Sequence, residues 1–415
     1  MTPREKLTAA LEHRAADELP FDLGATKATG ISASLLYRLR KLYGRDEPVK
    51  IHDTYQMLGL IDEQDYEAFG IDVAGVCHDI TCFGYRNKDW KPWITPDGTP
   101  ALIGGQCNMS TDAAGNLYIH PQGDLQAKPS GRMPKGGHYF DQLSRQEPFD
   151  EDDLDARWDY NEQFYLYDEE TLDSYAKDTD YLYKHTNMGI VINAECAAFG
   201  STTNILAPML KRTTGIRDIS EWMMAPYLYP DYVKEVLELQ AERGIENLKL
   251  LYEAVGNKPQ VIFLSATDFG TQRGLLISKD FFREFYVPYY KRINDWIHTN
   301  TTWRTLLHCC GGISDIMDDM CYMGVDCLNP IQADAAGMNP AELKERFDDR
   351  LVFWGAAVDN QTTLCQGTPA DVEKQFLERT KTLRKNGGFV CAITHNLQDT
   401  TPMENVQKVF ELIKR

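Results

Sequence analysis

Short apolar runs recur along this chain at a spacing that limits its fold to few architectures. Eight of them are rich in β-branched and aromatic residues, at 20–23, 72–76, 191–196, 261–266, 304–309, 327–331, 351–356 and 389–394. Amphipathic segments lie between most of these runs, and residues 230–255 carry their Val, Ile and Leu side chains mainly on one helical face. Continuous apolar strands separated by helices are typical of a parallel sheet covered on its outer side. The alternation predicts an α/β fold, a (β/α)8 TIM barrel.

Residues 82–183 do not follow this alternation. They are rich in Trp, Tyr, Gly, Pro and Asp, and turn signals separate short aromatic runs, as in residues 111–118. This pattern is typical of β-hairpins. We predict a single barrel domain over 1–415, with an aromatic, hairpin-rich insertion at 82–183, after the second strand and over the barrel mouth. The insertion either adds aromatic walls to a pocket or forms a surface elaboration or dimer contact, so a homodimer stays an open option.

Several helix starts are marked by a capping residue followed by proline. A cap oxygen and an acidic residue at the third helical position satisfy free amides, while proline gives up an amide that has no partner there. The pattern predicts helix starts at Thr2-Pro3, Asn339-Pro340, Thr368-Pro369 and Thr401-Pro402.

Composition excludes some partners. With 43 Lys and Arg against 62 Asp and Glu, the formal net charge is −19. Proteins that bind nucleic acids or anionic membranes present clustered cations, so neither is an expected partner. No apolar stretch is long enough to cross a bilayer, and the first residues form no apolar signal segment. We expect a cytoplasmic protein whose ten cysteines are reduced thiols.

The end of the fifth apolar run carries the residues best suited to a metal ion. Alternate residues of a strand face the same side, so His308 and Cys310 can point into one cavity while Cys309 points away. His and Cys together favour zinc. Active sites of these barrels lie at the carboxyl ends of the strands, where these residues fall. His395, at the tip of the last run, is the preferred third ligand; Cys391, which lies deeper in the barrel, and Glu195, near the end of the third run, are the alternatives.

Polar residues after two other strands could face a substrate. Asp268 and Gln272 follow the fourth apolar run and are our candidate catalytic residues, although Asp268 could equally order neighbouring amides. Asp359 and Gln361 follow the seventh run and have the same two interpretations.

Motifs along nearly the whole chain resemble the uroporphyrinogen decarboxylase-like superfamily, most closely its methyltransferase branch. The resemblance is carried by Arg4-Glu5-Lys6, Asp22-Leu23-Gly24, Asp268-Phe269-Gly270-Thr271-Gln272, His308-Cys309-Cys310-Gly311, Gly324 to Pro330, Phe353 to Asp359 and Thr401 to Asn405. It implies a (β/α)8 barrel and zinc held by a His-x-Cys pair plus a Cys from the last strand. His308 and Cys310 match the pair, but His395 stands where the family has that Cys.

The resemblance also implies a reaction. In that branch a methyl group moves between a small molecule and the cobalt of a corrinoid carried by a separate protein. A site with two His and one Cys is less electron-rich than one with two thiolates and polarises a bound oxygen more strongly, so we expect a methoxylated or methanol-like O-methyl donor, that is, O-demethylation. The alternatives are uroporphyrinogen decarboxylase, for which the chain lacks the expected arginine-rich segment after the first strand, and a non-catalytic barrel that binds a metal or a corrinoid protein.

Overall fold

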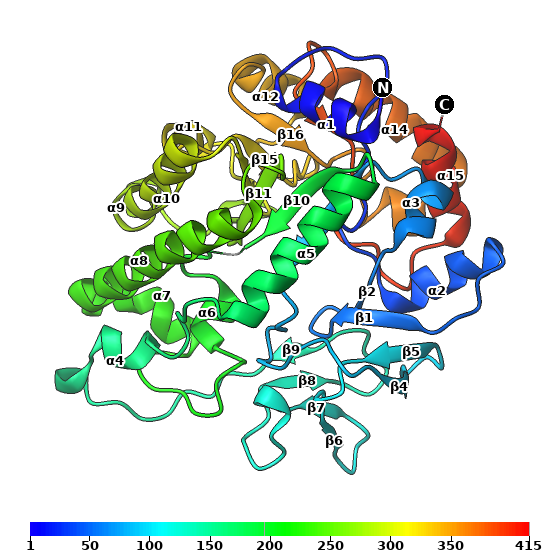
Figure 1. Ribbon diagram of the computed structural model, residues 1–415. Helices are drawn as coiled ribbons and strands as arrows, with labels where there is room; N and C mark the ends of the chain where they lie inside the picture. The colour runs from blue at the N-terminus through cyan, green and yellow to red at the C-terminus, as the bar shows by residue number, and fades with distance from the viewer. Residues whose placement is uncertain (195, 415) are drawn as a thin grey trace.

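A parallel sheet of seven strands forms the centre of the molecule (Figure 1). The computed structural model describes residues 1–194 and 196–414, so Glu195 lies outside the described residues. Neighbouring strands follow the order β3-β10-β11-β14-β15-β16-β17. Their bounds are β3 (Val73–Cys77), β10 (Gly189–Asn193), β11 (Val261–Ala266), β14 (Arg304–His308), β15 (Cys327–Asn329), β16 (Val352–Trp354) and β17 (Phe389–Val390). Seven of the eight predicted runs therefore contain a strand of this sheet.

The remaining run, at 20–23, closes the sheet into a barrel. Phe21 pairs with Cys391 just after β17, and Asp22 pairs with Val73 of β3, each through a single parallel bridge. The Asp22 amide donates to the Cys391 carbonyl at 2.9 Å. Pairing is this short because Pro20 has no amide to donate and Gly24, at φ 92°, turns the chain away. The predicted α/β barrel is confirmed, with its first strand reduced to two paired residues.

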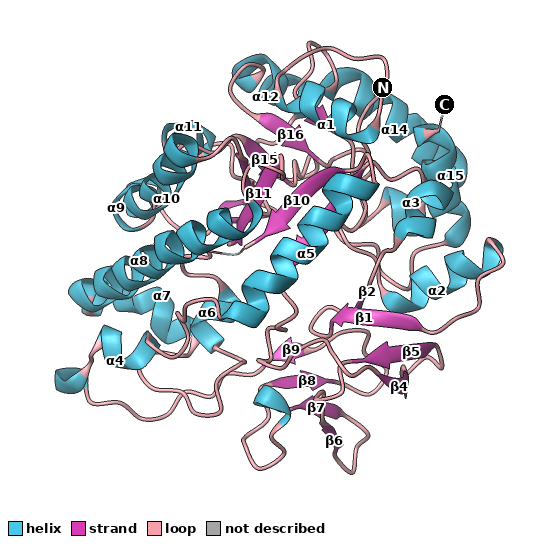
Figure 2. Cartoon of the chain, in the orientation of Figure 1, coloured by secondary structure: helices cyan, strands magenta, loops and turns pink. Residues whose placement is uncertain are grey.

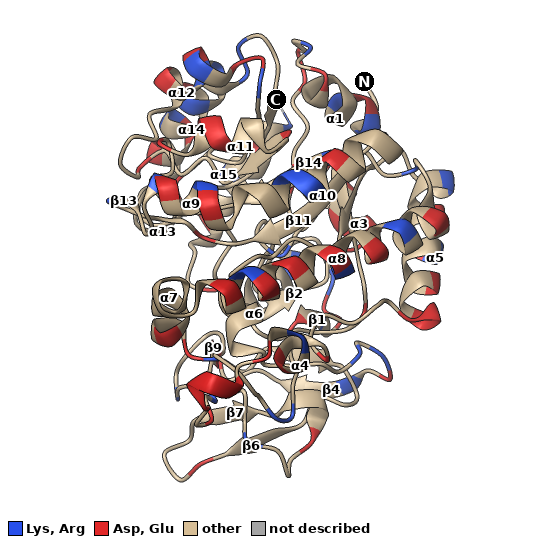
Figure 3. Cartoon of the chain, turned by 90° about the vertical axis from the view of Figure 1, so that its left-hand side faces the viewer, with Lys and Arg blue, Asp and Glu red and all other residues tan. Residues whose placement is uncertain are grey.

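Helices cover the outer side of the barrel (Figure 2). The longest, α8, spans Pro230–Val255, the bounds of the predicted amphipathic segment. Lys, Arg, Asp and Glu positions colour much of α8 and α12, whereas β11 carries none (Figure 3). The covering helices are α5 (Glu169–His185), α8, α10 (Val287–Asn300), α11 (Met317–Tyr322), α12 (Pro340–Phe347), α14 (Pro369–Leu383) and α15 (Met403–Ile413). Shorter helices are α2 (Ala33–Leu42), α3 (Glu63–Phe69), α4 (Ala156–Tyr160), α6 (Thr202–Leu206), α7 (Ile219–Leu228), α9 (Lys279–Phe285) and α13 (Thr363–Gln366).

Helix α1 (Pro3–Leu11) closes the amino end of the barrel. Its Leu7, Ala10 and Leu11 belong to the same buried cluster as the inward-facing residues of the strands. The contact is tight, because a Cβ on Gly189 at the start of β10 would lie 2.5 Å from the Leu7 side chain. Because α1 packs over that end, we expect a ligand to reach the barrel interior from the carboxyl ends of the strands.

Three of the four predicted helix caps are confirmed. The side chains of Thr2, Asn339 and Thr368 accept hydrogen bonds from amides of α1, α12 and α14. The prediction at Thr401 is wrong, because α15 begins one residue later with Pro402 at the cap position and no side-chain cap. The Thr401 hydroxyl instead faces the Cys365 thiol, 3.8 Å away.

Two small sheets lie beside the barrel (Figure 1). One has the order β2-β1-β5-β4 and the other β6-β7-β8-β9. Their strands are β1 (Val49–Asp53), β2 (Leu58–Gly59), β4 (Lys91–Ile94), β5 (Pro100–Ile103), β6 (Met109–Thr111), β7 (Leu117–Ile119), β8 (Gly131–Met133) and β9 (Asp141–Gln142). Since β1 pairs with β5, the sheets include residues from before β3 as well as from the 82–183 segment. Within the described residues, no helix has both the length and the apolar character needed to span a membrane.

Candidate metal centre

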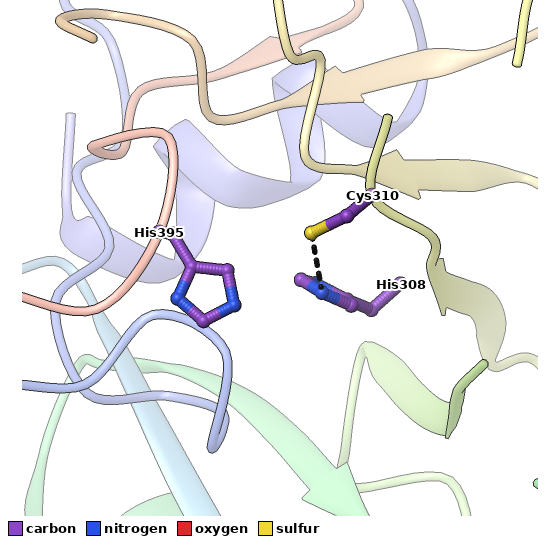
Figure 4. Close-up of side chains that lie close together, drawn as sticks. All are labelled: His308, Cys310 and His395. Atoms are coloured by element: carbon purple, nitrogen blue, oxygen red, sulfur yellow. Dashed lines mark hydrogen bonds between the residues drawn. The ribbon is translucent and has the colours of Figure 1, made fainter. Parts of the chain in front are cut away.

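The end of β14 presents an imidazole and a thiol to the same side. His308 is the last residue of the strand, and its Nε2 lies 3.3 Å from the Sγ of Cys310 (Figure 4). Cys309, between them, is fully buried and its Sγ accepts a hydrogen bond from the Phe269 amide at 3.3 Å. The side chains thus alternate as predicted, with Cys309 turned away from the other two.

His395 completes a group of three. It follows β17, and its ring faces the His308 ring with centroids 5.3 Å apart (Figure 4). One ligand atom from each of His308, Cys310 and His395 lies within 4.8 Å of the others. In a tetrahedral zinc site, ligand atoms at ~2.0–2.3 Å from the ion are roughly 3.3–3.8 Å apart. The three side chains therefore fit zinc after a shift of about 1 Å, well within rotamer adjustment.

The other candidate third ligands do not join this group. Cys391 is fully buried, pairs with Phe21 at the barrel seam and packs in the cluster between strands and helices. The proposal for Glu195 falls on a residue outside the described part of the chain. Among the described residues, His395 is the one that supplies the third ligand atom.

Burial controls the protonation of these side chains. Burial, helped by the neighbouring His308, lowers the pKa of His395 to about 4, so its ring is neutral at pH 7. Burial, with the nearby Asp268 carboxylate, raises the pKa of the Cys310 thiol, so an incoming metal ion must displace its proton. The Nδ1 of His395 accepts a hydrogen bond from the Asn396 amide at 2.8 Å. A neutral ring then carries its proton on Nε2. Before Nε2 can bind a metal ion, this proton must leave it, and if it moves to Nδ1 the hydrogen bond from the Asn396 amide is lost.

Asn329 of β15 is the neighbour of His308 across the sheet. Its Oδ1 lies 2.6 Å from the Nδ1 of His308, and its Nδ2 donates to the Trp354 carbonyl at 3.1 Å. Asn329 is 1% exposed, so water does not compete for these contacts. The sequence placed Asn329 in the Gly324 to Pro330 motif but did not predict a role for it at the site, although an amide in the apolar run of β15 was a signal for one.

A cavity of about 400 Å³ opens beside the three side chains. Cys310 and His395 line it, and the rest of its polar lining is mainly amide and hydroxyl groups. Among the described residues that line it, none is charged. The amides come from Gln272, Gln332, Asn360 and Gln361. Of these, Gln332 and Asn360 were not predicted from the sequence. The cavity thus offers hydrogen bonds without a fixed charge.

Of the two predicted catalytic residues, Gln272 lines this cavity, whereas Asp268 lies beside Cys310 and is not part of the lining. Asp268 is half exposed, its Oδ1 accepts from the Cys310 amide at 2.7 Å and lies 4.0 Å from the Nε2 of His308. Asp268 thus orders a neighbouring amide while remaining next to the ligands. Gln272 lies in the hairpin of β12 (Gly270–Thr271) and β13 (Gly274–Leu275), lines the cavity and donates to Gln361 at 3.3 Å.

Asp359 was predicted either to face a substrate or to order neighbouring amides, and the structure gives it the second role. It is buried, and its carboxylate accepts hydrogen bonds from the amides of Gln361 at 3.2 Å and Thr362 at 2.7 Å. These bonds cap the turn that leads into α13. Gln361 itself stays at the cavity.

Known proteins resemble this chain in sequence and in fold. The family model described as Uroporphyrinogen decarboxylase (URO-D) matches residues 192–415, which contain His308, Cys310 and His395. Among solved structures, a methyltransferase from Methanosarcina mazei resembles the chain with a TM-score of 0.55 and 18% sequence identity, covering 100% of this chain and 98% of that chain. At this identity the likeness shows a shared fold. No curated protein matches the sequence.

Proposed function

The chain belongs to the uroporphyrinogen decarboxylase (URO-D) family, and we propose that it is a zinc-dependent methyltransferase within that family. In this proposal a methyl group leaves the oxygen of a small methoxylated or methanol-like donor and ends on the cobalt(I) of a corrinoid carried by a separate protein. The carbon–oxygen bond breaks as the electron pair of cobalt(I) forms the carbon–cobalt bond. The leaving oxygen keeps the bonding pair, takes a proton from water and is released as the alcohol or phenol, or as water where the donor is methanol. The observation that carries the proposal is the convergence of His308, Cys310 and His395 at the open end of the barrel.

The chain's own residues divide the work. His308, Cys310 and His395 would hold the zinc ion, which when bound supplies a Lewis acid for an oxygen leaving group. The amides of Gln272 and Gln361 line the cavity beside them, where they can orient a donor by hydrogen bonds. The sealed amino end leaves the mouth as the route by which a partner protein reaches the donor.

The charge of the cavity argues against the decarboxylase alternative. A tetrapyrrole with many carboxylates needs clustered arginines for binding. The described residues that line the cavity include neither Lys nor Arg. The next two arginines after the first barrel strand are held elsewhere, since Arg40 pairs with Asp62 and Asp65 and Arg38 donates to the Asp399 carbonyl.

Metal content and methyl transfer together test the proposal. Purified protein is analysed for zinc and then incubated with a cobalt(I) corrinoid protein and a panel of methoxylated compounds, with cobalt methylation followed by absorbance. We expect about one zinc per chain and methylation by at least one donor. Both should be lost in His308→Ala. The matched control is His298→Ala, which removes an imidazole of α10 that pairs with Asp326 just before β15; neither residue lines the cavity.

Each outcome separates the alternatives. A His308→Ala protein with stoichiometric zinc and full activity contradicts the proposal. Zinc binding without transfer from any donor favours the non-catalytic barrel, and carbon dioxide release from a tetrapyrrole favours the decarboxylase.

A further inference from the structure

We infer that Asn329 is a positioning residue that sets the tautomer of His308 and thereby makes its Nε2 available to the metal. The inference rests on the proposed metal-dependent function for its purpose, but its geometry stands on the hydrogen bonds alone. Asn329 faces His308 across the β14–β15 pair, where the two residues are in register.

The orientation of the Asn329 amide follows from a backbone group. The carbonyl of Trp354 can only accept a hydrogen bond, so the nitrogen of the amide, Nδ2, must face it, at 3.1 Å. The oxygen, Oδ1, is then the atom that faces the Nδ1 of His308, at 2.6 Å. Because Oδ1 only accepts, Nδ1 must carry the proton. A neutral His308 therefore has its free lone pair on Nε2, the nitrogen that lies 3.3 Å from Cys310.

The fold leaves this amide no alternative arrangement. Asn329 is buried, and even a Cβ on Gly355 would lie 3.3 Å from its Nδ2. Trp354 is itself held from the other side, since its indole donates to the Asp22 carboxyl at 2.7 Å. The acceptor that orients Asn329 is thus part of the barrel wall.

Without Asn329, the same pocket favours the wrong tautomer. The Nδ1 of His308 would lose its acceptor, while Nε2 would keep the Cys310 sulfur within reach as an acceptor for its own proton. A proton between Nε2 and Sγ occupies the position where a metal ion must bind. Removing the hydrogen-bond partner of a ligating histidine typically lowers metal affinity by about 10–100-fold.

Two substitutions at this position separate orientation of His308 from support of the fold. Asn329→Asp keeps an acceptor for Nδ1 but loses the donor to Trp354, whereas Asn329→Leu loses both. A purely structural role predicts equal damage, because both variants lose the bond to the barrel wall. The matched control is Asn294→Leu, which removes a buried amide that donates to the Met323 carbonyl on the outer side of the barrel.

The first readout is the His308 tautomer in metal-free protein, from nitrogen chemical shifts of ¹⁵N-labelled histidine assigned with His308→Ala. We expect the proton on Nδ1 in the wild type, Asn329→Asp and Asn294→Leu, and on Nε2 in Asn329→Leu. The second readout is zinc affinity by chelator competition. We expect a loss of about 10–100-fold in Asn329→Leu and near-wild-type affinity in the other two variants.

Wild-type protein with the His308 proton on Nε2 overturns the inference even if no variant folds. Equal loss of zinc affinity in Asn329→Asp and Asn329→Leu also overturns it, in favour of a structural role. The proposed function fails by a different result, namely a wild-type protein that binds no zinc or transfers no methyl group. The tautomer readout needs neither zinc nor methyl transfer, so the two failures can be told apart.

Discussion

Asp22 is a carboxyl group buried inside the barrel, and its titration should make the protein less stable as pH rises. It is 1% exposed; its Oδ2 accepts from the Trp354 indole at 2.7 Å and its Oδ1 from the Ala25 amide at 3.0 Å. Burial raises its pKa from 3.8 to about 6, although these hydrogen bonds act in the opposite direction. The folded protein therefore holds this proton more tightly than the unfolded chain does.

The sign and size of the effect follow from these two pKa values. Between pH 3.8 and about 6 the unfolded chain has lost the proton while the folded protein still binds it, so the free energy of unfolding falls as pH rises. Each unit of pKa difference corresponds to about 1.4 kcal/mol, which gives roughly 3 kcal/mol in total and about 2 kcal/mol between about pH 4.5 and 7.5.

Asn in place of Asp22 should remove this dependence. Asp22→Asn keeps an acceptor for the Trp354 indole but puts an NH₂ against the Ala25 amide, at a pH-independent cost of about 1 kcal/mol. Urea unfolding of both proteins at the two pH values should show the variant gaining about 2 kcal/mol relative to wild type at the higher pH. Asp280→Asn, on the exposed surface of α9, controls for the loss of one carboxyl. A stability difference that stays constant with pH would refute the reasoning.

Three further predictions concern the cavity. His395→Cys, which restores the residue that the family resemblance expects, should retain zinc, whereas His395→Ala should weaken chelator-measured zinc affinity by about 100-fold or more; equal affinities would exclude His395 as a ligand. Gly311→Ala should cost about 1–3 kcal/mol of stability and lower zinc affinity, because Gly311 has φ 93° and its Cβ would lie 2.5 Å from the Gly270 carbonyl carbon; an unchanged melting temperature and zinc content would contradict this. Neutral methoxyphenols should be demethylated faster than their carboxylated counterparts, since the described cavity lining has no cation; faster rates with the carboxylated donors would show that a cation reaches the site.

Strand positions were the part of the fold that sequence patterns predicted well. The continuous apolar runs of β11, β14 and β16 are buried on both faces, so their composition alone identifies them. β1 was not predicted, because Val49–Asp53 offers only two apolar side chains, Val49 and Ile51, and is stabilised by pairing with β5, about 50 residues later. Such pairing depends on tertiary contacts that no local pattern records.

In the candidate site, too, residues could be predicted where the local sequence was enough, but not where contacts depend on how strands pair. His308, Cys310 and His395 were predicted because each lies at a strand end, a position that can be counted along the chain. The contact of Asn329 with His308 depends on the register between β14 and β15, and that of Asp268 with the Cys310 amide depends on the register between β11 and β14. Thr401 was predicted as the cap of α15 because Thr401-Pro402 matches the capping motif. The helix begins at Met403, so the true cap position is one residue later, at Pro402.

The barrel seam also determines when, during synthesis, the candidate site can form. Phe21 is made long before its partner Cys391, so a chain emerging from the ribosome holds an open sheet until β17 and Cys391 have been made. His395 follows this last strand directly, which means that the three ligand side chains cannot meet before the seam is complete. Metal loading is therefore expected only after β17 and His395 have been translated.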